Sequence, residues 1–210
     1  EKLRAAKPED KMTVFAVLMR LREICCDPRL VADNWTGSSA KLEACLELVT
    51  EAVAGGHRIL LFSQFTSMLE LLAKRLDEAG VSHFTLQGST PKPVRAEQVR
   101  RFNQGEADVF LISLRAGGTG LNLTAADIVI HYDPWWNLAA QNQATDRAYR
   151  IGQRNPVQVY RLIAQDTIEE KIVELQQAKQ SLADTVTGGA DGAILSMNPE
   201  QLLQLLGEEA

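Results

Sequence analysis

Short, continuous apolar runs alternate along the middle of the chain with segments whose apolar residues recur at helical spacing. Residues 59–62, 109–112 and 128–130 form such runs, and the mixed segments 83–86 and 157–163 are interpreted as two further strands. A continuous apolar run of this length is typical of a strand buried on both faces of a parallel sheet. The order strand–helix–strand therefore predicts βαβ units and an α/β fold, with a parallel sheet sandwiched by helices.

Two further helices are predicted before the first of these runs. Residues 11–27 carry apolar side chains at helical spacing, and Pro28 ends the pattern. The segment 33–40 reads as a linker in which Ser38 or Ser39 could cap an amphipathic helix that stops at the glycine pair 55–56.

A last long helix is predicted after the final strand. Thr167 and Glu170 stand at the spacing of a capping box. We therefore divide the chain into a leading helical segment (1–37), a main α/β domain (38–165), a bracing helix (166–186) and an acidic, flexible tail with one short helix (187–210).

Charge is distributed unevenly, which changes the significance of the net charge of −5. Residues 165–210 hold nine acidic and two basic residues, so the remainder is slightly basic. Residues 139–161 hold four arginines against Asp146 alone. A local basic patch on a near-neutral domain can bind phosphates.

Several classes of protein are excluded by composition. No apolar run approaches the ~18–20 residues needed to cross a bilayer. The three cysteines and three histidines match neither a disulfide framework nor a zinc site, so we expect no metal and a reducing, intracellular compartment.

Polar or glycine-rich segments follow four of the predicted strands. They are residues 63–66, 87–90, 113–120 and 131–137. Ligands of open α/β sheets bind beyond the carboxyl ends of the strands, where such loops expose amides and hydroxyls to phosphate oxygens. Each loop alone is equally explained as a tight turn, but four on one rim favour a ligand site. No GxxxxGK[ST] loop exists in the sequence, which predicts one half of a composite nucleotide site.

Gln143, Arg147 and Arg150 stand at spacings of four and three, so on a helix they would share a face. Two guanidinium groups and an amide can stabilise charge on a transferring phosphoryl group. The alternative is a solvated face, with Asp146 and Arg150 forming an ordinary ion pair. Trp135 and Trp136 also leave two interpretations. Tryptophans are more often core residues than ligand platforms, but on this rim they could contact nucleic acid or a partner domain.

Taken in order, six segments closely resemble the C-terminal RecA-like lobe of Swi/Snf-type ATPases, the double-stranded-DNA translocases of helicase superfamily two. The segments are LREICCDPRL, ILLFSQFTSMLELL, LQGSTPKPVRAEQVRRFN, VFLISLRAGGTGLNLTAADIVIHYD, PWWN…QATDRAYRIGQ and VYRLIAQDTIEEKI. The resemblance covers residues 19–182. Two departures are Asp27, where the family usually has histidine, and Leu138, where it usually has proline. A lobe-to-lobe contact of that histidine is therefore not carried over.

The resemblance implies roles for the residues at matching positions. Arg147 and Arg150 would be arginine fingers acting on ATP bound by a first lobe, and Gln143 would couple the site to lobe closure. The nucleotide cleft would be lined by Gly118, Gly120 and Asn122. DNA, mostly its phosphate backbone, would be gripped by Ser63, Gln64, Gly88, Ser89, Arg115 and Trp136. Magnesium would be held mainly by the first lobe.

These observations predict the second motor lobe of an ATP-driven translocase of double-stranded DNA, inactive alone. Its expected partners are the N-terminal RecA-like lobe of the same polypeptide, double-stranded DNA and a protein docked by the acidic tail, with no membrane. We expect it on DNA, in a bacterial cytoplasm or nucleoid, or in the nucleus of a eukaryote. Two alternatives stay open, namely a non-hydrolysing DNA-binding or interaction module and a lobe of an RNA-unwinding relative.

Overall fold

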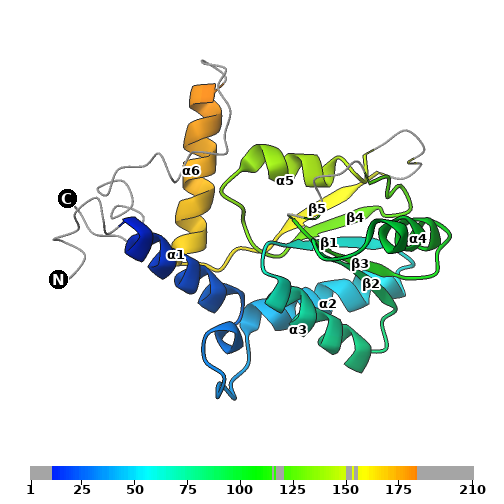
Figure 1. Cartoon of the computed structure of the whole chain (residues 1–210), viewed down its shortest axis with the longest axis horizontal. Coiled ribbons are helices and arrows are strands. Elements are labelled where there is room, and N and C mark those ends of the chain that lie inside the picture. The colour runs from blue at the N-terminus through cyan, green and yellow to red at the C-terminus, as the bar shows by residue number, and fades with distance from the viewer. Residues whose placement is uncertain (1–10, 115, 117–120, 150–152, 154–155, 184–210) are drawn as a thin grey trace.

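The structure is a computed structural model that describes residues 11–114, 116, 121–149, 153 and 156–183. Its elements are, in chain order, α1 (Lys11–Cys26), the 3₁₀ helix η2 (Pro28–Leu30), α2 (Ala40–Ala54), β1 (Ile59–Ser63), α3 (Thr66–Glu78), β2 (His83–Leu86), α4 (Lys92–Asn103), β3 (Val109–Ser113), β4 (Ile128–His131), α5 (Leu138–Thr145), β5 (Gln158–Arg161) and α6 (Ile168–Ala183) (Figure 1).

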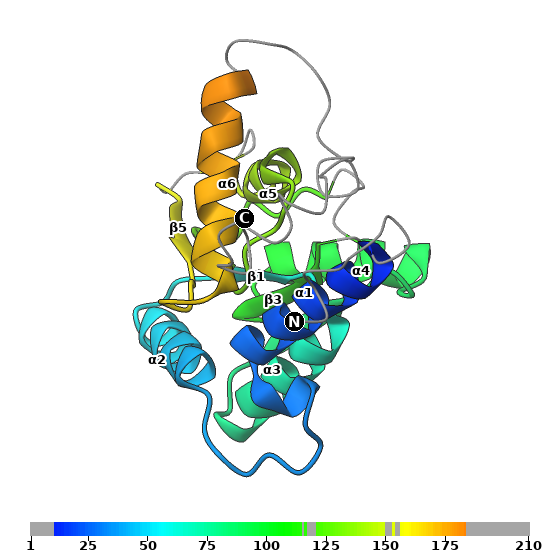
Figure 2. The same ribbon diagram turned by 90° about the vertical axis from the view of Figure 1, so that its left-hand side faces the viewer.

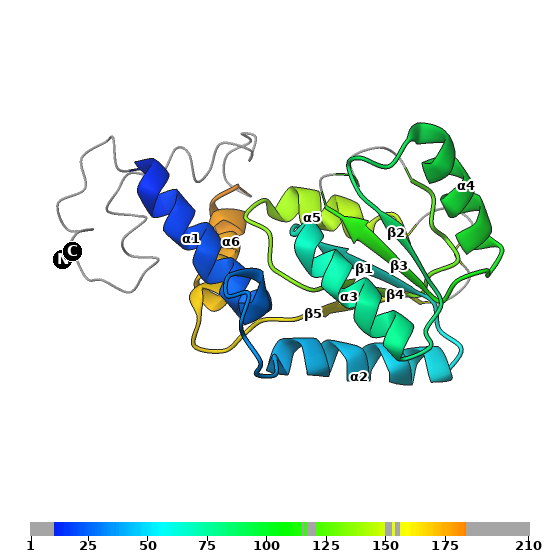
Figure 3. The ribbon, with the colours of Figure 1, turned by 60° about the horizontal axis from the view of Figure 1, so that its bottom comes forward.

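Within the described residues, the five strands form one sheet in the order β2-β3-β1-β4-β5, and every pairing is parallel. Helices cover both faces, with α2 and α3 on one side and α4 and α5 on the other (Figure 3). The predicted α/β architecture is therefore confirmed. Continuous burial of β1, β3 and β4 explains why their sequences read as unbroken apolar runs.

The sheet separates two apolar cores, and successive residues of β1 alternate between them. Ile59 and Leu61 face the core beneath α2 and α3, whereas Leu60 and Phe62 face the core beneath α4 and α5. This alternation follows from the period of two in a strand. Fully burying each such side chain contributes roughly 1.5–3 kcal/mol. Strands β3 and β4 alternate in the same way, so both cores share the three central strands.

The strand order creates a topological switch point between β1 and β4. The connection leaving β1 runs to β2 on one side of the sheet, and the connection leaving β4 runs to β5 on the other. Since all strands are parallel, their carboxyl ends meet on one rim. Ligand crevices of open α/β sheets lie at such a point, and here Ser63 ends β1 while Asp133 lies just beyond β4.

Helices α1 and α6 pack against each other beside the carboxyl ends of the strands (Figure 2). Their shared apolar cluster is Val14, Leu18, Ile168 and Ile172. None of the described helices is long and apolar enough to traverse a lipid bilayer.

The start of α6 differs slightly from the predicted capping box. The Thr167 hydroxyl oxygen accepts a hydrogen bond from the Glu169 amide at 3.1 Å. The Glu170 carboxylate accepts from the Asp166 amide at 2.8 Å rather than from that of Thr167. Both side chains therefore cap the helix, but the reciprocal bond is shifted by one residue. The predicted tail, 187–210, lies outside the described residues.

Candidate functional site

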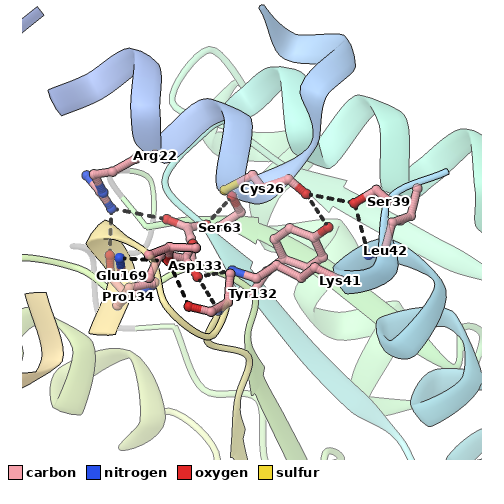
Figure 4. Close-up of polar contacts among 12 residues, drawn as sticks. Arg22, Cys26, Ser39, Lys41, Leu42, Ser63, Tyr132, Asp133, Pro134 and Glu169 are labelled. Carbon is pink, nitrogen blue, oxygen red and sulfur yellow. Dashed lines mark hydrogen bonds and ion pairs between the residues drawn. The ribbon is translucent and has the colours of Figure 1, made fainter. Parts of the chain in front are cut away.

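A buried aspartate joins the carboxyl ends of β1 and β4 at the switch point (Figure 4). Asp133 is 1% exposed, and its carboxylate accepts hydrogen bonds from the Ser63 hydroxyl at 2.5 Å and from the Gln64 amide at 3.2 Å. The Ser63 oxygen in turn accepts from the Phe65 amide at 3.2 Å. One carboxylate therefore fixes the loop that leaves β1.

The cation that faces Asp133 comes from α1. Arg22 is 0% exposed, and its Nη2 lies 3.6 Å from the Asp133 carboxylate and donates to the Pro134 carbonyl at 2.5 Å. The guanidinium also lies over the rings of Phe65 and Trp136, at 5.4 and 5.1 Å from their centroids. This arrangement combines an ion pair with cation–π contacts. Arg22 thus occupies the place where an open sheet would take a ligand.

Burial dominates the electrostatics of this pair. Burial lowers the pKa of Arg22, and the charge of Asp133 opposes that fall. Burial raises the pKa of Asp133, while Arg22 and the Ser63 hydroxyl oppose that rise. Each charge is costly to bury alone, so the two depend on each other.

A second set of polar contacts ties the same helices to the sheet. The Lys41 ammonium of α2 bonds the Glu169 carboxylate of α6, and both side chains are almost fully buried. The Tyr132 hydroxyl donates to the carbonyl oxygen of Cys26 at 2.9 Å, and Ser39 donates to the same oxygen at 3.3 Å. The last carbonyl of α1 is therefore satisfied by two donors.

The loop between β4 and α5 is held at both sides. The Trp135 amide donates to Gln141 Oε1 at 3.2 Å, and the Trp135 carbonyl accepts from Gln176 of α6. Asn137 caps α5 by accepting from the Ala140 amide at 3.1 Å. The backbone from 134 to 137 is consequently tied to α1, α5 and α6 together.

The predicted helical face of Gln143, Arg147 and Arg150 is wrong. Helix α5 ends at Thr145, so Arg147 lies in the turn that follows. Gln143 is exposed whereas Arg147 is 3% exposed, so the two side chains do not present one surface. Arg150 lies outside the described residues.

The turn that carries Arg147 is fixed by contacts from distant segments. The Leu123 amide donates to the Arg147 carbonyl at 3.3 Å. His131 Nε2 bonds the Thr145 hydroxyl at 2.9 Å, and the His131 ring stacks on Phe62 with centroids 5.5 Å apart. Burial lowers the pKa of His131 to about 4, with a smaller contribution from Arg161. This histidine is therefore neutral at physiological pH.

The structure brings Arg147 close to one of the predicted cleft residues. Asn122 is exposed and precedes Leu123, whose amide reaches the Arg147 carbonyl. The Asn122 carbonyl accepts from Asn103 of α4 at 2.8 Å. Gly118 and Gly120 lie outside the described residues. Asn122 therefore directly precedes the residue whose amide contacts the Arg147 backbone, and its place in a nucleotide cleft stays a prediction.

The predicted DNA contacts divide into accessible and buried residues. Gly88 and Ser89 are exposed in the loop after β2, and Gln64 is half-buried. The Ser63 hydroxyl is buried and bonded to Asp133, so Ser63 shapes its loop and is withdrawn as a direct contact. Trp136 is half-buried against Arg22 and the α1–α6 cluster, and its contact with DNA stays a prediction. Arg115 lies outside the described residues.

Sequence reasoning missed Arg22, Lys41 and Glu169. A faint signal existed for Arg22, which stands four residues after Leu18 and so interrupts the apolar face of its helix. No comparable signal marks Lys41 or Glu169, because each looks like an ordinary charge in the first turn of a helix. Over the residues that the structure describes, no group of three or more potential ligands gathers into a metal site.

Residues 40–152 match the family model described as helicase conserved C-terminal domain. The chain belongs to this family. The C-terminal domain of a SWI2/SNF2 ATPase from Sulfolobus solfataricus superimposes on this helicase lobe with a TM-score of 0.75 and 28% identity, over 96% of this chain and 84% of that one. The C-terminal part of the Fun30 ATPase domain gives a TM-score of 0.67 at 28% identity, over 89% of this chain and 60% of that one. The lobe is therefore of the Swi/Snf type.

Curated relatives of this helicase lobe agree with that assignment. An uncharacterized ATP-dependent helicase of Mycoplasma pneumoniae is 38% identical over 98% of this chain and 20% of its own length. The putative ATP-dependent helicase/translocase YwqA of Bacillus subtilis is 41% identical over 93% of this chain and 22% of its own length. The mouse SWI/SNF-related matrix-associated actin-dependent regulator of chromatin subfamily A member 1 is 39% identical over 84% of this chain and 18% of its own length. The chain spans about a fifth of the length of these relatives.

Proposed function

We propose that this chain is the second motor lobe of an ATP-driven translocase of double-stranded DNA, and that Arg147 and Arg150 act as arginine fingers on ATP bound by a first lobe. The observation that carries the proposal is the contact of Arg147 with Leu123, because it sets the arginine turn beside Asn122. The sequence holds two arginines suited to phosphate but no GxxxxGK[ST] loop, as expected of one half of a composite site.

ATP bound between the two lobes would supply the phosphoryl group that is transferred to water. The chain's own residues would then orient the phosphates and neutralise their developing charge. Because Arg147 is 3% exposed, its side chain has to turn toward the first lobe when the lobes close. Gln143 is exposed on α5, which suits a contact that senses closure. Magnesium would be held mainly by the first lobe.

DNA would be held along the same rim, at Gly88, Ser89, Gln64 and Arg115. Gly88 has open space around its Cα, so a phosphate can approach the backbone closely. Closure would move this grip relative to that of the first lobe, which converts hydrolysis into translocation. Phosphate contacts make such a grip tolerant of sequence and sensitive to salt.

Two further expectations belong to this proposal. The acidic tail is a candidate docking segment for a protein partner. A DNA-associated location in a bacterial cytoplasm or nucleoid is favoured by the relatives from Mycoplasma pneumoniae and Bacillus subtilis, and the mouse relative keeps the nucleus open.

The test is the DNA-stimulated ATPase activity of the chain alone and mixed with the first lobe of the same protein. We expect activity in the mixture only. In the full-length protein, Arg147→Ala and Arg150→Ala should each lower kcat by about a thousandfold or more. Arg100→Ala is the matched control, because Arg100 is an exposed arginine on α4 paired with Glu97, and it should leave kcat unchanged.

Normal turnover in both finger variants would refute the assignment of the arginines. No activity in a mixture that assembles on DNA would instead favour a non-hydrolysing binding module. Binding to duplex DNA and to duplex RNA, each titrated with salt, separates a DNA translocase from an RNA-unwinding relative, and we expect the DNA to bind more tightly.

A further inference from the structure

Arg22 is a buried cation that none of the proposed ATP or DNA contacts uses. It comes from α1, yet it fills the switch point between β1 and β4. Its guanidinium meets the Asp133 carboxylate, the Pro134 carbonyl and the rings of Phe65 and Trp136. Four residues from two loops of the rim therefore converge on one side chain.

Stability alone gives little reason for a charge at this position. A buried ion pair can often be replaced by apolar residues of similar volume at no loss of stability. What an apolar side chain cannot do is donate to a backbone carbonyl and orient a carboxylate. Arg22 does both, at Pro134 and at Asp133. The guanidinium thus fixes the direction of the backbone as it leaves β4.

From Pro134 a continuous series of contacts leads to Arg147. The Trp135 amide bonds the side chain of Gln141 in α5. The Gln141 carbonyl accepts from the Thr145 hydroxyl at 3.3 Å, and Thr145 is the last residue of α5. The Arg147 amide donates to the Ala144 carbonyl of the same helix at 3.3 Å. Each step is a hydrogen bond or a single helix, so displacement of the 134–137 backbone would be passed on to the arginine turn.

We propose that Arg22 is a positioning residue for Arg147, which makes the geometry of the arginine finger depend on the docking of α1 against the rim. The inference rests on the proposed function of Arg147. Asp133 also holds the Gln64 amide, so the same ion pair would align the loop proposed to grip DNA.

Amide hydrogen exchange tests the positioning without reference to activity. In the full-length protein, Arg22→Met should speed exchange in residues 135–145 by about tenfold or more, while the amides of β3 stay unchanged. Arg22→Lys should act in the same direction, because an ammonium lacks the planar fork that stacks between two rings. Arg20→Met is the matched control on the same helix, since Arg20 is exposed and pairs with Glu23. Faster exchange in β3 as well would reduce Arg22 to a structural residue and overturn the proposal.

Steady-state kinetics with saturating duplex DNA supply the second readout. Arg22→Met should lower kcat by about tenfold or more, because a misplaced catalytic group loses rate before it loses binding. The KM for ATP should change by less than about threefold. Normal kcat in Arg22→Met, with kcat lost in Arg147→Ala, would refute the positioning role alone. Normal kcat in Arg147→Ala and Arg150→Ala would refute the proposed function of the arginines.

Discussion

Lys41 at the start of α2 and Glu169 at the start of α6 form a buried ion pair, although 128 positions separate them in the chain. The Glu169 carboxylate also accepts from the Ala164 amide at 2.8 Å. Burial raises the pKa of Glu169, and the Lys41 charge opposes that rise. The pair therefore fastens α6 to the helix that precedes the first strand.

Breaking this pair on one side should destabilise the lobe strongly. Lys41→Met leaves a carboxylate buried without its cation, and we expect the free energy of unfolding to fall by about 3–5 kcal/mol. Lys41→Met combined with Glu169→Met should recover most of that loss, because apolar side chains can replace a buried pair. Denaturant unfolding of the single and double variants measures the coupling.

The half-exposed pair of Arg75 and Glu43 is the control for this cycle. Because solvent screens it, Arg75→Met should change the free energy of unfolding by less than about 1 kcal/mol. Additive effects of Lys41→Met and Glu169→Met would contradict the coupling.

His131 should make the lobe sensitive to mild acid. Its pKa is about 4 in the folded state against 6.5 for an ordinary histidine. Because the pKa is lowered on folding, the neutral, buried His131 adds about 3 kcal/mol to the free energy of unfolding above about pH 6.5. That stabilisation is lost as the pH falls toward about 4. Urea unfolding across this range should give a shallower pH dependence for His131→Gln than for the wild type. Parallel curves would show that protonation of His131 is not responsible.

Replacing Asp27 with the histidine that the family usually has should destabilise this lobe. Its carboxylate accepts from the Arg29 amide, Nε and Nη2 at 2.9, 2.8 and 2.7 Å. Burial alone would raise the pKa of Asp27, but these hydrogen bonds outweigh it and the pKa is lowered. Asp27→His and Asp27→Ala should each lower the free energy of unfolding by about 2 kcal/mol, because the cap of η2 is lost.

Asp27→Asn tests whether the acceptor or the charge matters, since the amide oxygen can still cap. We expect a smaller loss than for Asp27→Ala, measured by thermal unfolding. Asp33→Ala, at an exposed position of the same segment, should stay within about 0.5 kcal/mol of the wild type. If Asp27→His proves as stable as the wild type, Asp27 does not stabilise the lobe by capping η2.

The buried hydrogen bond of the Tyr132 hydroxyl can be compared with the exposed one of the Tyr160 hydroxyl. Tyr132→Phe keeps the buried ring but removes the donor to Cys26, which should cost about 1–2 kcal/mol of unfolding free energy. Tyr160→Phe removes an exposed bond to Gln158 and should cost less than about 0.5 kcal/mol. Equal effects in denaturant unfolding would mean that the Cys26 contact contributes nothing specific.

The sheet was predictable because burial on both faces leaves unbroken apolar runs at β1, β3 and β4. The edge strand β5 was the exception, since residues 157–163 were expected and Gln158–Arg161 pair. Most side chains of β5 are exposed, so its apolar residues do not mark where pairing stops.

The end of α5 was not predictable from periodicity. The Arg147 carbonyl accepts from Leu123, a residue far away in the sequence, and this tertiary contact competes with continuation of the helix. The partnership of Arg22 with Asp133 was hidden for the same reason, because spacing reports neighbours on one helix and not pairs more than a hundred residues apart. The motifs identified the lobe, but they did not show which of their side chains pair with one another across it.

The apolar cluster of α1 and α6 bears on the order in which parts of the lobe unfold. Its buried members, Val14, Leu18, Ile168 and Ile172, belong to neither core of the sheet. Segments with their own small set of contacts open at lower free energy than the global transition. On heating or pulling, the amino-terminal half of α1, which carries Val14 and Leu18, should therefore open first, because Arg22 and Cys26 hold the other half of that helix to the sheet.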